Sequence, residues 1–184
     1  MEVKHYHDHN IAEKILANVL GEISCHGNTE LMEREKLAFF CSSRCPGSVI
    51  LKTYDFANDV SRSDTVVMSG FHSPVEQELL KLLLDRHHPV IVCPARSISR
   101  MRVPADYKTP ISEGRMLILS QFKENQNRMT VKNAEIRNQF VASIADKILI
   151  AHAEPGGKLE HLKTKVIEKG TELKWKSISL NEYV

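Results

Sequence analysis

Apolar and polar positions follow one another along the chain in blocks that predict strands and helices in turn. Short apolar runs with the length of buried strands occur at Leu37–Cys41, Thr65–Ser69, Pro89–Cys93, Met116–Ser120 and Lys147–Ala151. The segments between them repeat apolar residues every three or four positions and predict helices over Val49–Val60, Val75–Arg86, Val131–Ala145 and Lys158–Lys169. We expect Leu173–Ile178 to add an edge strand and the proline-containing segment Ile98–Gly114 to be irregular.

This alternation predicts an α/β fold, a Rossmann-like three-layer sandwich with a mostly parallel sheet between helices. Near-continuous apolar runs such as residues 89–93 are typical of strands that are covered on both faces. With right-handed crossovers, we expect the five strands to form one parallel sheet in the order 3-2-1-4-5.

The first 35 residues differ from the rest. Apolar residues from Ile11 to Ile23 have helical spacing, Gly27 and Asn28 interrupt the pattern, and a charged stretch follows up to Lys36. We therefore expect an N-terminal helix and linker over residues 1–35 and a Rossmann-like domain over residues 36–184. A length of 184 residues suits one domain with a short appendage.

Composition narrows the function classes only modestly. The net charge of +2 permits a nucleic-acid partner but does not require one. The four cysteines form no Cys-x-x-Cys pair, and the alternating histidines at positions 5, 7 and 9 lack a supporting ligand cluster, so we expect no metal site. The charged start and the absence of a long apolar run predict neither a signal peptide nor a membrane span. We therefore expect a cytoplasmic protein with no membrane partner.

Polar and basic residues follow the first three predicted strands directly. The carboxyl ends of parallel strands form the edge at which open α/β sheets bind ligands. Hydroxyl, guanidinium and glycine groups there suit an anionic ligand, although each loop could also be a plain polar turn. The capping pattern Ser73-Pro-Val-Glu76 gives Glu76 a structural role at the start of the next helix. The ligand-binding candidates from these loops are Ser42, Ser43, Arg44, Ser69, Gly70, His72 and Arg96.

Further candidates flank the fifth strand. Arg137 and Asn138 lie on the helix before it, with Arg137 expected near the edge of the apolar face, where a surface ion pair is the alternative role. Gly156, Gly157 and Lys158 open the last helix, whose N-terminus favours phosphate. We predict that candidates from all these segments converge on one crevice: Ser42, Arg44, Ser69, Gly70, Arg137, Asn138 and Gly156.

From about Leu37 to Ile178 the chain resembles the DNA-processing protein A (DprA/Smf) family of the SLOG superfamily. The resembling segments are Ser42-Ser43-Arg44, Ser69-Gly70, Arg137-Asn138 and Ala145-Asp146, while Phe71-His72-Ser73-Pro74, Gln139 and Glu154-Pro155-Gly156-Gly157 depart from the family pattern. The resemblance implies an extended Rossmann fold and binding of single-stranded DNA. The full-length members of the family also help to load a recombinase onto that DNA, so the resemblance raises the same expectation for a full-length relative.

A second SLOG branch, the LOG-type phosphoribohydrolases, competes with this interpretation. Pro155-Gly156-Gly157 is similar to the start of its motif, but Lys158-Leu159-Glu160 lacks the Gly-Thr pair and the catalytic glutamate in register. We therefore expect a protein that binds single-stranded nucleic acid or a nucleotide-like phosphate ligand without catalytic turnover and without a cofactor. The alternatives are a LOG-type phosphoribohydrolase and a nucleotide-sensing module, and self-association into a homodimer is compatible with the sequence.

Overall fold

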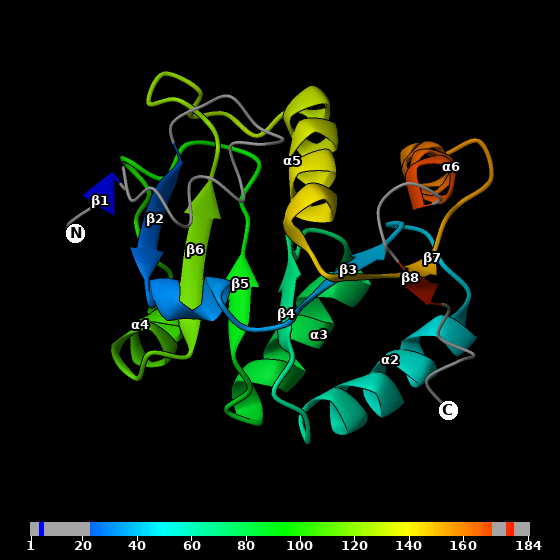
Figure 1. The fold of residues 1–184 in the computed structure, drawn as a ribbon, viewed down its shortest axis with the longest axis horizontal. Coiled ribbons are helices and arrows are strands. Elements are labelled where there is room, and N and C mark those ends of the chain that lie inside the picture. Colours follow the sequence, from blue (N-terminus) through cyan, green and yellow to red (C-terminus); the bar gives the residue numbers. More distant parts are fainter. Residues whose placement is uncertain (1–3, 6–22, 171–175, 179–184) are drawn as a thin grey trace.

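The computed structural model describes residues 4–5, 23–170 and 176–178, and Figure 1 shows their arrangement. The strands are β1 (Lys4–His5), β2 (Ser24–Gly27), β3 (Lys36–Cys41), β4 (Val66–Ser69), β5 (Val90–Val92), β6 (Met116–Ser120), β7 (Lys147–His152) and β8 (Lys176–Ile178). The helices are the 3-10 helix η1 (Thr29–Met32) and the α-helices α2 (Gly47–Val60), α3 (Pro74–Asp85), α4 (Ala105–Ser112), α5 (Val131–Ile144) and α6 (Lys158–Gly170). The helix expected from Ile11 lies, up to residue 22, outside the described residues.

The described strands form one sheet in the order β1-β2-β6-β5-β4-β3-β7-β8. Strands β3 to β7 pair in parallel with one another, as predicted, and the α/β Rossmann-like fold class is confirmed. The predicted order 3-2-1-4-5 is wrong, because β6 lies beside β5 and not beside β3. The chain therefore takes three successive crossovers in one direction before it returns across the sheet to β7.

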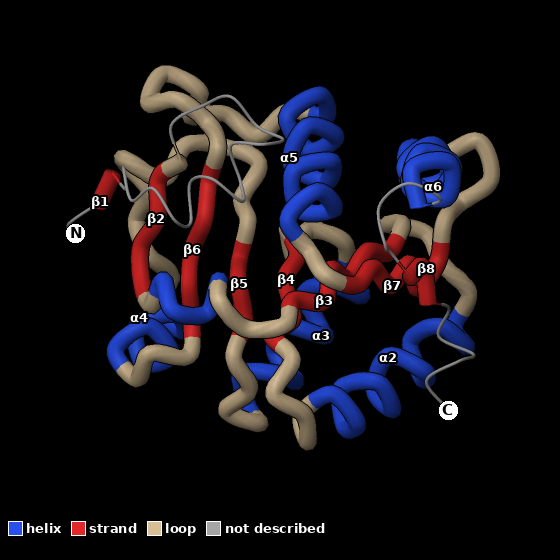
Figure 2. The backbone as a smooth tube through the Cα atoms, viewed as in Figure 1, coloured by secondary structure: helices blue, strands red, loops and turns tan. Residues whose placement is uncertain are grey.

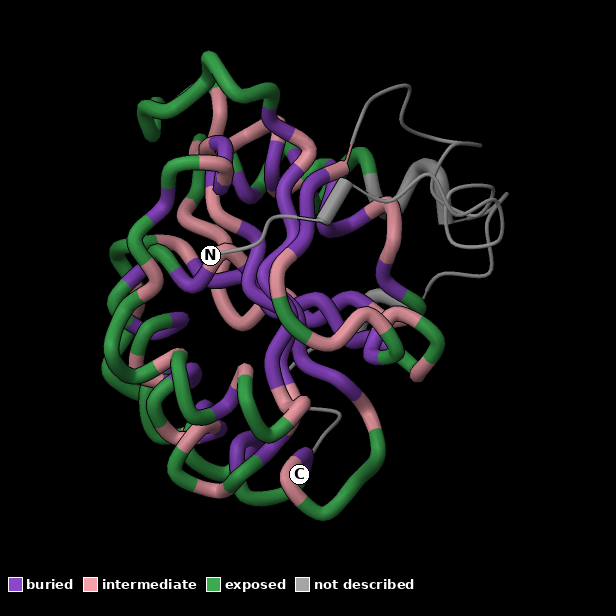
Figure 3. Tube along the Cα trace, turned by 90° about the vertical axis from the view of Figure 1, so that its left-hand side faces the viewer, coloured by how far each residue is buried: buried purple, intermediate pink, exposed green. Residues whose placement is uncertain are grey.

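Helices cover both faces of this sheet, so the molecule has three layers (Figure 2). Alternate strand residues such as Phe39 pack with α2 and α3 on one face, and Phe40 and its equivalents pack with α5 and the start of α6 on the other. Figure 3 shows the buried strands as the purple centre of the molecule between more exposed segments. This burial of both faces explains why the strand sequences are almost continuously apolar.

Residues 24–32, which we expected to be linker, contribute to the folded body. Strand β2 pairs antiparallel with β6 from Ser24↔Ser120 to Gly27↔Leu117. Leu31 of η1 is buried in the core. The division of the chain at residue 35 stays a prediction.

Helix α4 corrects a second local expectation, because residues 98–114 are not irregular throughout. Pro104 precedes the helix and caps it in an extended conformation, a position where proline costs little since no intrahelical N–H bond is lost. Tyr107 and Ile111 then pack against the core. No helix among the described residues is long and apolar enough to cross a bilayer.

Candidate functional site

A cleft of about 690 Å³ opens at the carboxyl edge of the sheet. Its walls come from the loops after β3, β4, β5 and β6 and from the first half of α5. This is the edge at which the sequence predicted a ligand site. The sequence-predicted residues that line the cleft are Ser43, Gly70, His72, Arg96, Arg137, Asn138 and Lys158.

Two predicted serines support the loops of this edge and do not line the cleft. Ser69 is fully buried, and its Oγ accepts a hydrogen bond from the Phe71 backbone N–H at 3.2 Å. Ser42 Oγ accepts one from the Glu154 N–H at 3.0 Å, which ties the loop after β3 to the loop after β7. Both hydroxyls are therefore used as acceptors within the protein.

The three remaining candidates lie outside the cleft lining, on the loops that Ser42 and Glu154 connect. Arg44 is almost fully exposed, with its Nη1 3.8 Å from Glu154 Oε1. The backbone N–H of Gly156, a residue with φ of +71°, donates to Glu160 Oε2 at 2.6 Å. A Cβ at Gly157 would lie 2.7 Å from the Glu154 carbonyl oxygen, so this turn requires glycine. The predicted crevice therefore gathers Gly70, Arg137 and Asn138.

Arg137 is buried, which corrects the expectation of a position near the exposed edge of α5. Only 5% of the residue is exposed, and its Nη1 donates to the Cys93 carbonyl at 3.0 Å. Burial lowers the pKa of Arg137, while the negative charge of Glu76 acts in the opposite direction. Asp146 follows α5 at the amino edge of the sheet and binds Lys36, so it is no ion-pair partner of Arg137. Arg137 is thus a cation built into the floor of the cleft.

Gly70 makes room for this guanidinium. A Cβ added at Gly70 would stand 1.0 Å from Arg137 Nη1 and 1.8 Å from its Cζ. The flat guanidinium therefore lies directly against the backbone that follows β4. This contact explains the pairing of a glycine after β4 with an arginine on α5, which sequence reasoning treated as two separate ligand residues.

Glu76 holds the neighbouring loops in place. Its Oε2 accepts from the N–H groups of His72 and Ser73, which completes the predicted capping box of α3. Its Oε1 accepts from the Cys41 N–H at the end of β3, a link that the sequence did not reveal. A carboxylate so fully occupied by backbone donors is a structural anchor and a poor general base.

The orientation of Asn138 follows from Arg137. Arg137 Nε donates to Asn138 Oδ1 at 2.7 Å, and a guanidinium has no acceptor atom. The amide oxygen of Asn138 must therefore face Arg137, which leaves the Nδ2 donor for the cleft that this residue lines. Arg137 positions Asn138, and Asn138 presents an N–H group suited to an anionic or carbonyl-bearing ligand.

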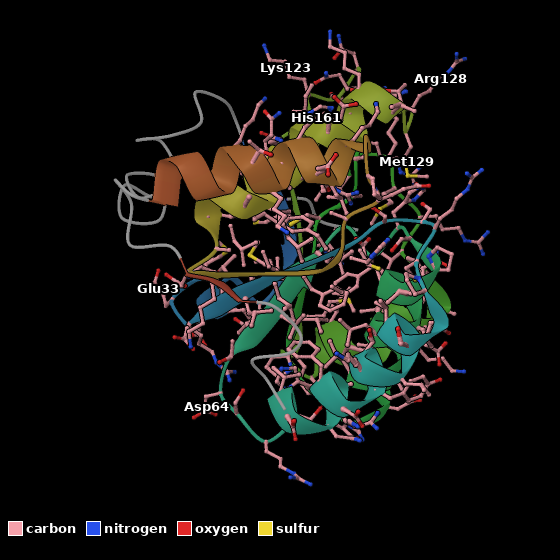
Figure 4. The ribbon with its side chains drawn as sticks, turned by 90° about the vertical axis from the view of Figure 1, so that its right-hand side faces the viewer. Glu33, Asp64, Lys123, Arg128, Met129 and His161 are labelled. Carbon is pink, nitrogen blue, oxygen red and sulfur yellow. The ribbon has the colours of Figure 1, made fainter. Side chains whose placement is uncertain are left out.

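Sequence reasoning missed the apolar part of the cleft. Phe71 and Tyr107 line it, and Met129 and Val131 are 58% and 63% exposed at its wall. Figure 4 shows Met129 beside Arg128, near the end of the molecule where Lys123 also lies. Two exposed apolar side chains next to an otherwise polar loop were the signal available in the sequence. The cleft therefore combines apolar surface with cations.

The loops at this edge are also basic. The segments 42–46, 70–73, 93–104, 121–130 and 153–157 hold six arginines and lysines against two glutamates. Arg100 lies 3.5 Å from Glu124, and Arg44 faces Glu154. Within the described part of the chain, no carboxylate lies within 4 Å of the remaining four cations, which are Arg96, Arg102, Lys123 and Arg128. Among the described residues no group of three or more metal-ligating side chains occurs.

Comparison with known proteins identifies the class of protein. The chain belongs to the family described as DNA recombination-mediator protein A, whose family model matches residues 8–164. No curated protein sequence matches it significantly.

Two solved structures share the fold. DNA processing protein A from Streptococcus pneumoniae superposes with a TM-score of 0.72 and 15% identity, over 92% of this chain and 60% of that one. The protein of the same name from Helicobacter pylori, whose structure concerns its mode of binding single-stranded DNA, gives 0.70 and 16% identity, over 98% and 91%. The chain thus spans less than two thirds of the pneumococcal protein.

Proposed function

We propose that this protein binds single-stranded DNA in the cleft at the carboxyl edge of its sheet. The observation that carries the proposal is the group of cations at this edge that have no acidic partner among the described residues, around a cleft with apolar walls. Unpaired Lys and Arg side chains attract the phosphate backbone, since each contact releases condensed counterions. The family of the chain and the DNA-binding Helicobacter pylori relative support the same ligand class.

The apolar walls favour a single strand over a duplex. Proteins that bind single strands combine a basic groove with aromatic or apolar surfaces on which unpaired bases stack. Tyr107 and Met129 offer such surfaces within the cleft, and Arg96 and His72 lie among the same lining residues. In a duplex the faces of the bases are already stacked on one another, so they cannot stack on the apolar side chains of the cleft.

The carboxylates near the cleft favour a protein that binds its ligand without a catalytic reaction. Glu76 is occupied by three backbone N–H groups, Glu154 faces Arg44, and Glu135 pairs with Lys158. Each of these groups therefore already has a partner at the position where a hydrolase would need an available acid or base. No specific contact favours a phosphoribohydrolase.

The test compares matched charge removals at opposite edges of the sheet. Arg96→Ala and Arg128→Ala should each weaken binding of a fluorescent oligothymidylate by about three- to tenfold and reduce the salt slope by about 0.7. Fluorescence anisotropy across a salt series measures both quantities.

Arg62→Ala is the control, because Arg62 is exposed at the amino edge of the sheet. Equal losses for Arg62→Ala and the two variants at the carboxyl edge would contradict the proposed site.

A further inference from the structure

The cleft continues into a second hollow between α5 and α6. This groove, of about 70 Å³, is lined by Gln139, His161 and Lys165 together with the apolar Leu162. Three further residues line both the groove and the cleft, namely Glu135, Asn138 and Lys158. The two hollows therefore adjoin at these shared residues. Helices α5 and α6, which flank the groove, lie on the same face of the sheet (Figures 1 and 4).

The groove is basic along α6. Lys158, His161 and Lys165 are exposed and follow one another at helical spacings of three and four residues, so they lie on one face of the helix. Seven residues of helix span about 10 Å, so these basic side chains can contact neighbouring phosphates of one strand. On the α5 side, Gln139 and Asn138 add neutral hydrogen-bonding groups.

An ion pair stands where the two hollows meet. Lys158 Nζ donates to Glu135 Oε1, and both side chains are about half exposed. An exposed ion pair contributes little net stability, because solvent screens it. A phosphate that enters the junction can therefore replace the Glu135 carboxylate as the partner of Lys158 at small cost.

We infer that a DNA strand bound in the cleft continues between α5 and α6, where Lys165 and His161 contact its backbone. At the junction Lys158 exchanges Glu135 for a phosphate of the strand. This inference rests on the proposed function and extends the site beyond the cleft. It makes affinity depend on strand length, since a short strand fills only the cleft.

The experiment compares two lysines of the same helix on two strand lengths. Lys165→Ala in the full chain should weaken binding of a long oligothymidylate (about 16 nucleotides) and leave a short one (about 6) unchanged. We expect a loss of about three- to tenfold and a salt slope smaller by about 0.7 for the long strand. Lys163→Ala is the control, because Lys163 is also exposed on α6 but does not line the groove.

A second variant tests the junction. Glu135→Gln should strengthen binding of the long strand by about two- to threefold, because it frees Lys158 without adding a charge. Weaker binding by this variant would overturn the exchange at the junction.

The outcomes separate this inference from the proposed function. If Lys165→Ala and Lys163→Ala affect the long strand equally, or if Lys165→Ala weakens the short strand as much as the long one, the extended path is overturned while the cleft stands. If the wild-type protein binds neither strand, the proposed function itself fails.

Discussion

The two edges of the sheet carry similar residue types but use them differently. At the amino edge, the segments 33–35, 61–65, 86–89, 113–115 and 145–146 hold four arginines and five acidic residues. Two of the four arginines there have acidic neighbours, Arg34 with Asp64 and Arg115 with Glu113. At the carboxyl edge, cations outnumber anions and four of them have no acidic partner among the described residues. In Figure 4, Glu33 and Asp64 lie far from Arg128 and Met129.

The difference separates charges that hold the fold from charges available to a ligand. Lys36 at the amino edge is 8% exposed and donates from its Nζ to Asp146 and to two backbone carbonyls. Arg96 at the carboxyl edge is half-buried, and no hydrogen bond or ion pair of its guanidinium occurs within the described residues. A count of charges would treat Lys36 and Arg96 alike. Their hydrogen-bond and ion-pair partners distinguish them.

The largest change in stability should come from Arg137. This residue is an exception to the contrast between the two edges, because it lies beneath the carboxyl edge but is buried and hydrogen-bonded within the protein. Arg137→Ala should lower the free energy of unfolding by about 2–4 kcal/mol, since it removes charge-assisted hydrogen bonds and leaves a cavity beside Gly70. Urea denaturation measures the change. A change below about 0.5 kcal/mol, the usual range for an exposed side chain, would show that Arg137 serves the ligand alone.

A smaller effect should come from Asp146 at the amino edge. Asp146→Asn keeps the shape of the side chain but removes the charge that faces Lys36 Nζ at 2.7 Å. We expect a loss of about 1 kcal/mol in unfolding free energy, because the carboxylate is itself half exposed, and no change in DNA affinity. Asp55→Asn on the exposed side of α2 is the control. Weaker DNA binding by the Asp146 variant would remove the functional contrast between the edges.

The smallest effect concerns the pH dependence of the amino edge. The hydrogen bond from Lys147 lowers the pKa of Glu35 below its ordinary value of 4.5, which outweighs the raising effect of burial. A carboxyl whose folded pKa is lowered stabilises the protein above the unfolded pKa and loses this contribution as the pH falls through the folded pKa. Glu35→Gln should therefore make the free energy of unfolding slightly less dependent on pH below about pH 4.5. If acid titrations of the variant and the wild type differ only above pH 6, the assignment is wrong.

Local pattern predicted the strands and helices well because each carries its own periodicity. The extent of α5 was predicted to within one residue, and the capping box of α3 was predicted as observed. The predicted strand order was wrong, because β6 can join either edge of a three-stranded sheet while every crossover stays right-handed. The observed choice depends on contacts between distant segments, including β2, whose short run gave no strand signal.

The sequence predicted which residues lie at the carboxyl edge better than it predicted their contacts. Position after a strand placed His72 and Arg96 at this edge, where both line the cleft. The same rule could not separate Ser43, which lines the cleft, from Ser42, whose hydroxyl is used by the Glu154 N–H. Nor could helical periodicity reveal that Gly70 leaves space for Arg137, since that contact joins residues 67 positions apart. The contribution of the apolar walls to binding, the homodimer and the cytoplasmic location stay predictions.

The hydrogen bond between Gly156 and Glu160 has a consequence for small anions. Glu160 is tethered one helical turn from the N–H group that it occupies, so it acts as an intramolecular competitor with an effective concentration of at least the millimolar order. Free phosphate or a mononucleotide at ordinary concentrations gains little by displacing it. We therefore expect the start of α6 to bind small anions weakly, whereas a polyanion that is held by several cations elsewhere does not need this N–H group.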